Sequence, residues 1–173
     1  MTTSNSTNFE LDVAEYIEEA FERCGLELRT GYDLQTAKRS LNIMLAEWAN
    51  RGLNQWTIEQ RTQALTADDS DYSLGTDVID ILSAVVRRST TDFSMSRISR
   101  DTYLAIPTKT TTGRPTQFFL DRQITPNLKI WPAPENSTDV ILYDALTRIQ
   151  DADGAINTME VPFRFYPCLT AGL

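Results

Sequence analysis

The stretch GRPTQFFLDRQITPNLKIWPAPENSTDVILYDALTRI, residues 113–149, is the most informative part of this chain. It predicts three short strands, TQFFLDRQ, NLKIWPA and DVILYDALTRI, which are separated by proline-marked turns. Its apolar and aromatic side chains are suited to packing, and it contains no residue suited to catalysis. The stretch therefore favours a structural or interaction protein over an enzyme.

Two amphipathic helices are expected before this block. The first is predicted to begin near Thr7, which has capping-box spacing with Glu10, and to stop at Gly25. The second is predicted over residues 33–50, with Gly52 ending it. Apolar residues recur at steps of three or four in both helices: Phe9, Val13, Ile17, Ala20, Phe21 and Cys24, then Leu34, Ala37, Leu41, Met44, Leu45 and Trp48.

The spacing of apolar residues changes in the segment between the two helices and residues 113–149. A strand is predicted near Trp56 and Ile58, ADDSDYSLG is interpreted as a turn, and DVIDILSAVVRRS as one buried strand or a strand pair. SRISRDTYLAIP predicts a short helix capped by Ser99, and KTTTGRP predicts a loop long enough to be mobile. A last helix is expected to begin within MEVPFRFYPCLTAGL, with proline near its first turn.

These elements predict an α+β fold, in which an antiparallel N-terminal helix pair is completed as a bundle by a C-terminal helix and carries an inserted antiparallel β-rich domain. The expected division is a flexible N-terminus, a helical hairpin, a β-rich domain with a short inserted helix near 97–106, and a linker leading into a C-terminal helix. These parts cover residues 1–7, 8–53, 54–149 and 150–173.

Composition limits the classes of partner. The chain has 173 residues, enough for a packed core, and its 16 Lys and Arg against 24 Asp and Glu leave a formal charge of −8. Such an acidic chain is poorly suited to binding nucleic acid through phosphate neutralisation. The N-terminus lacks the apolar region of a signal peptide, and no run approaches the roughly 20 apolar residues of a membrane span. We therefore expect a soluble protein of intracellular origin without a membrane partner.

Several kinds of chemistry lack their residues. The chain contains no histidine, which removes the commonest general base, the usual catalytic triads and most zinc sites. No phosphate-binding glycine motif occurs, and the three lysines show no SxxK arrangement. Cys24 and Cys168 lie far apart and are interpreted as buried thiols of a reducing compartment. The sequence predicts no enzyme activity and no cofactor or metal.

Two acidic loops deserve comparison with cation sites. Asp68, Asp69 and Asp71 lie in one loop, and Asp151 and Asp153 in another. Hard cations bind carboxylate oxygens, but neither loop has the twelve-residue calcium pattern with its terminal Glu. Solvated turns are the favoured interpretation.

The first helix carries an acidic face with a single Arg23 beside it, formed by Glu10, Asp12, Glu15, Glu18, Glu19 and Glu22. A pair of catalytic carboxylates is one interpretation of such spacing. A solvated helix face is favoured, because charged residues opposite an apolar stripe normally face water.

Basic residues gather weakly at Arg87, Arg88, Arg97 and Arg100. Ordinary surface charge is the simpler interpretation. The alternative is a set of salt bridges to the acidic helix of a neighbouring copy, which would suit a head-to-tail ring. Trp131 is expected at the packed centre of the opening block, as an anchor of the core or of an interface.

Two zones of the chain resemble the head-to-tail adaptor, or connector, proteins of tailed bacteriophages, especially short-tailed ones. The first zone is LNIMLAEWANRGLNQW, and the second is DYSLGTDVIDILSAVVR followed by GRPTQFFLDRQITPNLKIWPAPE. The resemblance rests on the order and spacing of these residues: Leu41, Met44, Leu45, Trp48, Gly52, Trp56, Tyr72, Leu74, Val78, Ile79, Gly113, Arg114, Pro115, Leu128, Trp131, Pro132 and Pro134. The family usually continues into C-terminal helices, and this chain ends where they would begin.

The resemblance implies a structural virion protein made in the host cytoplasm and placed at the head–tail interface. It would form a ring, expected to contain twelve copies, beneath the portal protein of a filled capsid. The ring would extend the DNA channel and provide the docking site for a tail or nozzle protein. An acidic wall would let DNA pass without specific binding.

Two other interpretations stay open at the level of sequence. One is a soluble, non-enzymatic binding module, similar to a β-sandwich that carries a helical hairpin. The other is a tail gatekeeper or a peptidoglycan-degrading accessory protein. The missing histidine weighs against a lytic enzyme.

Overall fold

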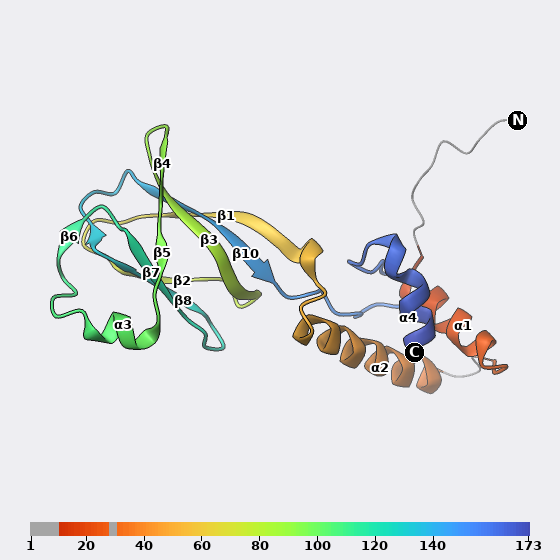
Figure 1. Cartoon of the computed structure of the whole chain (residues 1–173). Helices are drawn as coiled ribbons and strands as arrows, with labels where there is room; N and C mark the ends of the chain where they lie inside the picture. Colours follow the sequence, from red (N-terminus) through yellow and green to blue (C-terminus); the bar gives the residue numbers. More distant parts are fainter. Residues whose placement is uncertain (1–10, 28–30) are drawn as a thin grey trace, which may run out of the picture. The chain divides into compact units, whose positions relative to one another are not determined.

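The computed structural model describes residues 11–27 and 31–173 and confirms the α+β class. The chain divides into two compact units (Figure 1). The helical unit comprises Met1–Trp56 and Ile149–Leu173, and the β unit comprises Thr57–Arg148. The second unit is thus inserted into the first along the chain. The predicted flexible terminus over residues 1–7 lies outside the described residues.

Helix α1, Val13–Arg23, begins later than predicted. The capping box is formed by Asp12 and Glu15, each of whose carboxylates accepts a hydrogen bond from the other's backbone N–H at 2.9 Å. Asp12 is already extended, so the predicted start near Thr7 is wrong, and its partner Glu10 lies outside the described residues.

The C-terminal segment also positions the start of α1. The free N–H groups of Val13 and Ala14 donate to the carbonyls of Asn157 and Ala155, at 3.0 and 2.9 Å. The first amides of a helix have no partner within it, so these bonds satisfy donors that would otherwise require water. Contacts from residues so distant in sequence explain why a local pattern misplaced the helix start.

Two glycines end the helices as predicted. Gly25 follows α1 and Gly52 follows α2, Gly31–Asn50, with φ of 71° and 70°. In both cases the glycine N–H bonds a carbonyl three residues back, and the next N–H bonds one five residues back. This pair of bonds is the Schellman motif, which requires a left-handed residue at the glycine position.

One apolar core joins the parts of the helical unit. The predicted stripe of α2 is confirmed, because Ala37, Leu41 and Leu45 are buried on it while Ile43, off the stripe, is exposed. Tyr16 of α1 packs edge-on against Tyr166, with ring centroids 5.0 Å apart. The core also includes Val13, Ile17, Ala152, Met159, Val161 and Leu169.

The last helix is short and begins as the sequence predicts. A 3-10 turn, η2 (Phe163–Phe165), leads into α4, Tyr166–Gly172, with a proline in its first turn. Leu169 of α4 is buried in the helical core. The rings of Trp48 and Trp56 lie 5.9 and 4.9 Å from that of Phe165.

The β unit contains two four-stranded sheets. The first has the order β1-β10-β3-β4 and is antiparallel throughout. The second has the order β2-β8-β7-β5, in which β5 runs parallel to β7. Strand bounds are β1 Ile58–Ala64, β2 Asp71–Ser73, β3 Val78–Arg88, β4 Thr91–Ser94, β5 Ser96–Arg97, β7 Gln117–Asp121, β8 Asn127–Trp131 and β10 Val140–Thr147.

Smaller elements complete this unit. A 3-10 turn, η1 (Gln55–Thr57), precedes β1, and a short parallel pair joins β6, Thr112–Gly113, to β9, Ala133–Pro134. Helix α3, Arg100–Ala105, is capped by Ser99 as predicted, although its expected range near 97–106 overlaps β5.

The sequence prediction located the long strands and missed the short ones. All three strands of the opening block are confirmed as β7, β8 and β10, and DVIDILSAVVRRS forms the single strand β3. The stretch ADDSDYSLG is not only a turn, because β2 lies within it and pairs with β8. Strands of two to four residues carry too few positions to show an alternating pattern, which explains why β2, β4, β5, β6 and β9 were not predicted.

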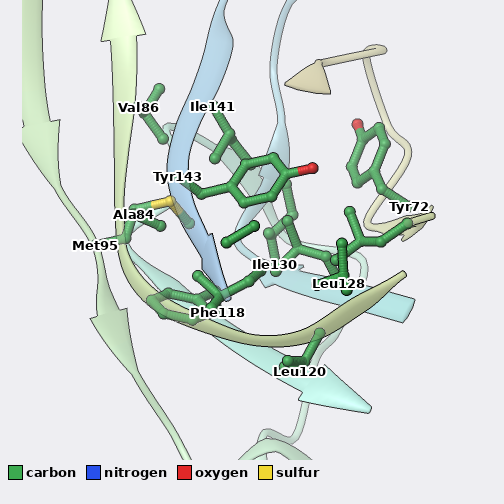
Figure 2. Close-up of a cluster of buried hydrophobic side chains, with 14 of the residues drawn as sticks. Tyr72, Ala84, Val86, Met95, Phe118, Leu120, Leu128, Ile130, Ile141 and Tyr143 are labelled. Atoms are coloured by element: carbon green, nitrogen blue, oxygen red, sulfur yellow. The ribbon is translucent and has the colours of Figure 1, made fainter. Parts of the chain in front are cut away.

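Both sheets contribute to one buried core (Figure 2). Ile141 and Tyr143 enter it from β10, and Phe118 and Ile130 enter it from β7 and β8. These residues are at most 5% exposed, and the core residues of β7, β8 and β10 occupy alternate positions along each strand. The packing that the opening block predicts is therefore internal to the β unit.

Replacing a core isoleucine should destabilise the β unit strongly. Ile130→Ala removes a fully buried side chain and should lower the free energy of unfolding by about 2–5 kcal/mol. Ile124→Ala is the matched control, because Ile124 is 87% exposed and its loss should change stability by less than about 0.5 kcal/mol. Urea unfolding of both variants measures the difference, and equal losses would contradict the assigned core.

Candidate functional site

The acidic face of α1 separates into structural and free carboxylates. Glu15 completes the capping box, and Glu19 forms an ion pair with Arg23 at 2.8 Å. Glu18 and Glu22 are exposed, and within the described part of the chain neither side chain forms a hydrogen bond or ion pair. These two side chains are therefore free to present negative charge outward.

The predicted arginines already have carboxylate partners within the β unit. Arg87 forms a bidentate ion pair with Asp92, with N–O distances of 2.6 and 2.7 Å. Arg100 pairs with Asp121, and its guanidinium lies 5.6 Å from the centre of the Phe119 ring. The pairing expected between copies would thus add to these contacts or replace them.

Arg88 holds the most buried carboxylate of this network. It donates to both oxygens of Asp139, at 2.8 to 3.2 Å, and to Glu135 at 2.7 Å. The Asp139 side chain is only 2% exposed and also accepts from Asn136. A buried carboxylate that lost its arginine would be strongly destabilising, so Arg88 is a structural residue of the β unit.

Asp80 joins two arginines from different segments. Arg97 donates to it at 2.8 and 3.1 Å, and Arg122 donates at 2.6 Å. Burial favours a raised pKa for Asp80, but hydrogen bonds from Arg97 and the Ile81 amide, with the charges of both arginines, outweigh burial and lower it. The cluster holds β3 to β5 and to the β7–β8 turn.

Trp131 lies outside the buried core, which corrects its expected place at the packed centre. Leu128 and Ile130 are fully buried, whereas Trp131 is half-buried on the other face of β8. Its indole N–H donates to the carbonyl of Thr108 at 3.1 Å. Successive residues of a strand face opposite ways, so neighbours of Ile130 cannot share its core position.

The segment 107–116 makes contacts with the end of α3 and with neighbouring strands. Lys109 donates to the carbonyls of Leu104 and Ile106 at 3.2 and 3.1 Å, and β6 pairs with β9. The Arg114 guanidinium lies 3.9 Å from the centre of the Phe93 ring. From its composition, this segment is interpreted as a loop long enough to be mobile. Its threonine-rich sequence does not indicate the contacts that it makes in the folded chain.

The comparison with known families extends over nearly the whole chain. The family model described as SU10 adaptor protein matches residues 11–173, which include both units. The chain belongs to the SU10 adaptor protein family. The adaptor resemblance stated from sequence is thereby confirmed, and the chain is a structural adaptor of the phage type. No curated protein matches it.

Both cysteines of the adaptor are exposed, so the prediction of buried thiols is wrong. Cys24 follows the last turn of α1, where the backbone leaves the helix. Cys168 lies in α4 beside the buried Leu169, on a different face of this short helix. Apolar spacing alone placed Cys24 on the core stripe.

No metal or membrane element emerges from the described residues. Within residues 11–27 and 31–173, no group of three or more cysteine or acidic side chains is arranged to hold a metal ion. No helix in that part of the chain is long and apolar enough to cross a membrane. The acidic loop at 151–153 instead bonds to its own unit, because Lys38 donates to the Asp153 carbonyl at 2.6 Å.

The helical unit of the adaptor contains a cavity of about 280 Å³. Its apolar lining includes Phe21, Ala37 and Leu173, and two exposed side chains, Leu26 and Tyr32, stand at it. No local sequence pattern indicates this cavity, because its lining comes from the end of α1, the start of α2 and the last residue.

The Asp80 cluster should make the β unit sensitive to acid. A carboxylate whose pKa is lowered on folding stabilises the fold above its unfolded pKa of about 3.9, and this contribution is lost as the pH falls through the folded pKa. Asp80→Asn should therefore cost about 1–3 kcal/mol at pH 7 and much less near pH 2.

Urea unfolding at the two pH values measures this effect. Asp68→Asn is a suitable control, because Asp68 is exposed, has a φ of 64° that Asn tolerates, and lies in the same unit. The Asp68→Asn substitution should change the free energy of unfolding little at either pH. An Asp80→Asn cost that does not depend on pH would contradict the charge-based role.

Proposed function

We propose that this adaptor forms a ring of identical copies beneath the portal protein, extends the DNA channel and provides the docking site for the tail. The observation that carries the proposal is the family match over residues 11–173. Its place in the virion is accordingly the head–tail interface, and the proposed number of copies is twelve.

The distribution of charge supports a role beside DNA that does not bind it. The helical unit has 12 acidic and 6 basic side chains, a net charge of −6, whereas the β unit has 12 and 10, a net charge of −2. Most of the −8 of the chain thus belongs to the helical unit. A negative wall repels phosphates, so DNA can slide past it without being held.

Glu18 and Glu22 are the best candidates for part of such a wall. Both are exposed and free of ion pairs with other described residues, whereas Glu15 and Glu19 hold the helix itself. The proposed contacts between copies place the exposed N–H groups of Arg87 and Arg100 near acidic side chains of a neighbour. Such contacts would be head to tail, as a closed ring requires.

The mass of the assembled protein tests the ring and the portal together. We expect the purified adaptor to be a ring, or a monomer that becomes a stoichiometric ring when its portal protein is added. Mass photometry of the adaptor alone, the portal alone and the mixture distinguishes these states. A monomer that ignores the portal under every condition would overturn the proposed function.

Reversing the free charges of α1 should impair the passage of DNA. Glu18→Lys with Glu22→Lys places two cations where the wall is proposed, and ejection should slow about tenfold or more through attraction of phosphates. Particles assembled with the variant are assayed for genome retention and ejection. Unchanged values of both would rule out the lining role.

A matched control separates position from charge. Asp101→Lys reverses one charge at an exposed site of the β unit, as Glu22→Lys alone does on α1, and should leave ejection near that of the unaltered adaptor, whereas Glu22→Lys alone should already slow it. The melting temperatures of all variants should agree within a few degrees, because the substituted side chains make no ion pairs with described residues.

A further inference from the structure

The first sheet of the β unit has two free edges, formed by β1 and β4. The direction of the backbone groups on β1 follows from its pairing with β10. The Leu65 N–H donates to the Asp139 carbonyl at 3.1 Å, and hydrogen-bonded pairs alternate along an antiparallel ladder. The N–H and C=O groups of Gln60, Thr62 and Ala64 therefore point away from β10.

The β1 edge lacks several of the features that usually prevent strands from joining, although the strand carries Glu59 and Arg61 and the Ala64 carbonyl accepts a hydrogen bond from the Gln63 side chain at 3.0 Å. It has seven residues in unbroken register with β10, without proline, glycine or bulge. Gln60, Thr62 and Ala64, whose backbone groups point outward, are exposed and uncharged. Natural edge strands are normally short, bulged or charged, because a regular free edge accepts further strands.

The β4 edge can be assigned in the same way. The Met95 N–H donates to the Ala84 carbonyl at 3.0 Å, which continues the β3–β4 ladder. The alternation then directs the backbone groups of Asp92 and Ser94 away from β3. Both residues are exposed.

The two edges of this sheet are complementary to each other. Four strands that alternate in direction leave β1 and β4 antiparallel, so β4 of a second copy can lie antiparallel beside β1. The outward-pointing residues Thr62 and Ser94 both carry side chains on the face away from the core, so the joined sheets would keep a continuous core face.

The second sheet does not offer this match. Its edges are β2 and β5, which have three and two residues, and β5 runs parallel to its neighbour β7. Strand direction therefore does not alternate across this sheet, and edges so short would form few hydrogen bonds. The complementary pair of edges belongs to the first sheet.

We propose that β1 of one copy pairs with β4 of the next copy, so that the first sheets of neighbouring adaptors form one antiparallel ladder. This inference rests on the proposed function, because it describes the contact that would close the ring. A contact between two different edges is heterologous and propagates from copy to copy, whereas pairing of β1 with itself would stop at a dimer. The proposed ladder brings Asp92 and Ser94 opposite residues of the set Gln60, Thr62 and Ala64.

Cysteine cross-linking tests which edges meet. In a full-length background with Cys24→Ser and Cys168→Ser, the adaptor carrying Thr62→Cys and Ser94→Cys is assembled and treated with a short thiol-specific cross-linker. Within one chain the two positions are separated by two strands, about 14 Å. The proposal predicts a series of covalently linked multimers, from dimer upward, on a denaturing gel.

Three controls accompany this variant. Each single cysteine variant should give no multimers, since a dimer from Thr62→Cys alone would indicate that β1 pairs with itself and would overturn the proposal. Thr62→Cys with Thr125→Cys moves the second thiol to the exposed β7–β8 turn and should give no ladder.

A proline substitution tests the same edge without cysteine chemistry. Thr62→Pro removes an N–H that points away from β10, so the internal ladder is kept while strand addition is blocked. The concentration needed for half-maximal assembly should rise at least about tenfold, whereas Thr62→Ala, which keeps the N–H, should change it less than about twofold. Circular dichroism confirms that each variant is folded.

The outcomes separate this inference from the proposed function. Rings of normal mass that show no Thr62–Ser94 ladder and tolerate Thr62→Pro would overturn the edge pairing and leave the adaptor function intact. A protein that forms no ring with or without portal would overturn both. If Thr62→Pro fails to fold, the cross-linking result decides the question.

Discussion

The β unit depends on the place of β10 between β1 and β3. This strand is hydrogen-bonded on both sides and supplies Ile141, Tyr143 and Ala145 to the core. Its pairing with β1 also brings together the two points where the chain enters and leaves the unit. There the hydroxyls of Thr57 and Thr147, both buried, donate to each other's carbonyls at 2.8 Å.

That closure allows one chain to build two units. After β10 the chain rejoins the helical unit, where Ala155 and Asn157 satisfy the first amides of α1. The side chain of Asn42 in α2 accepts a hydrogen bond from the Ala152 N–H at 2.7 Å and donates one to the Ala152 carbonyl at 3.3 Å. The helical core therefore contains segments from both sides of the β unit in the sequence. These segments can pack together because the β unit begins and ends at neighbouring positions.

Much of this fold was predictable because its signals are local. The stripe through Leu41 and Leu45, the stop at Gly52 and the cap at Ser99 depend on residues within a few positions of each other. The start of α1 was not predictable, because distant carbonyls help to set it. Trp131 was misplaced by one position in a strand, which is enough to move a side chain to the opposite face.

The candidate site shows the same limit. The sequence identified the charged residues but not their partners, because Arg88 meets Asp139 and Arg97 meets Asp80 only after the strands have assembled. Charges that fold into such pairs contribute to stability, and those left free, such as Glu18 and Glu22, are available for partners. The free edge of β1 was equally hidden, since strand order cannot be inferred from a single strand.

Electron cryo-microscopy of the adaptor mixed with its portal protein would show the proposed ring itself. We expect a closed adaptor ring coaxial with the portal, with a central channel continuous between the two. Adaptor copies bound singly around the portal, or a closed ring that leaves no channel, would contradict it.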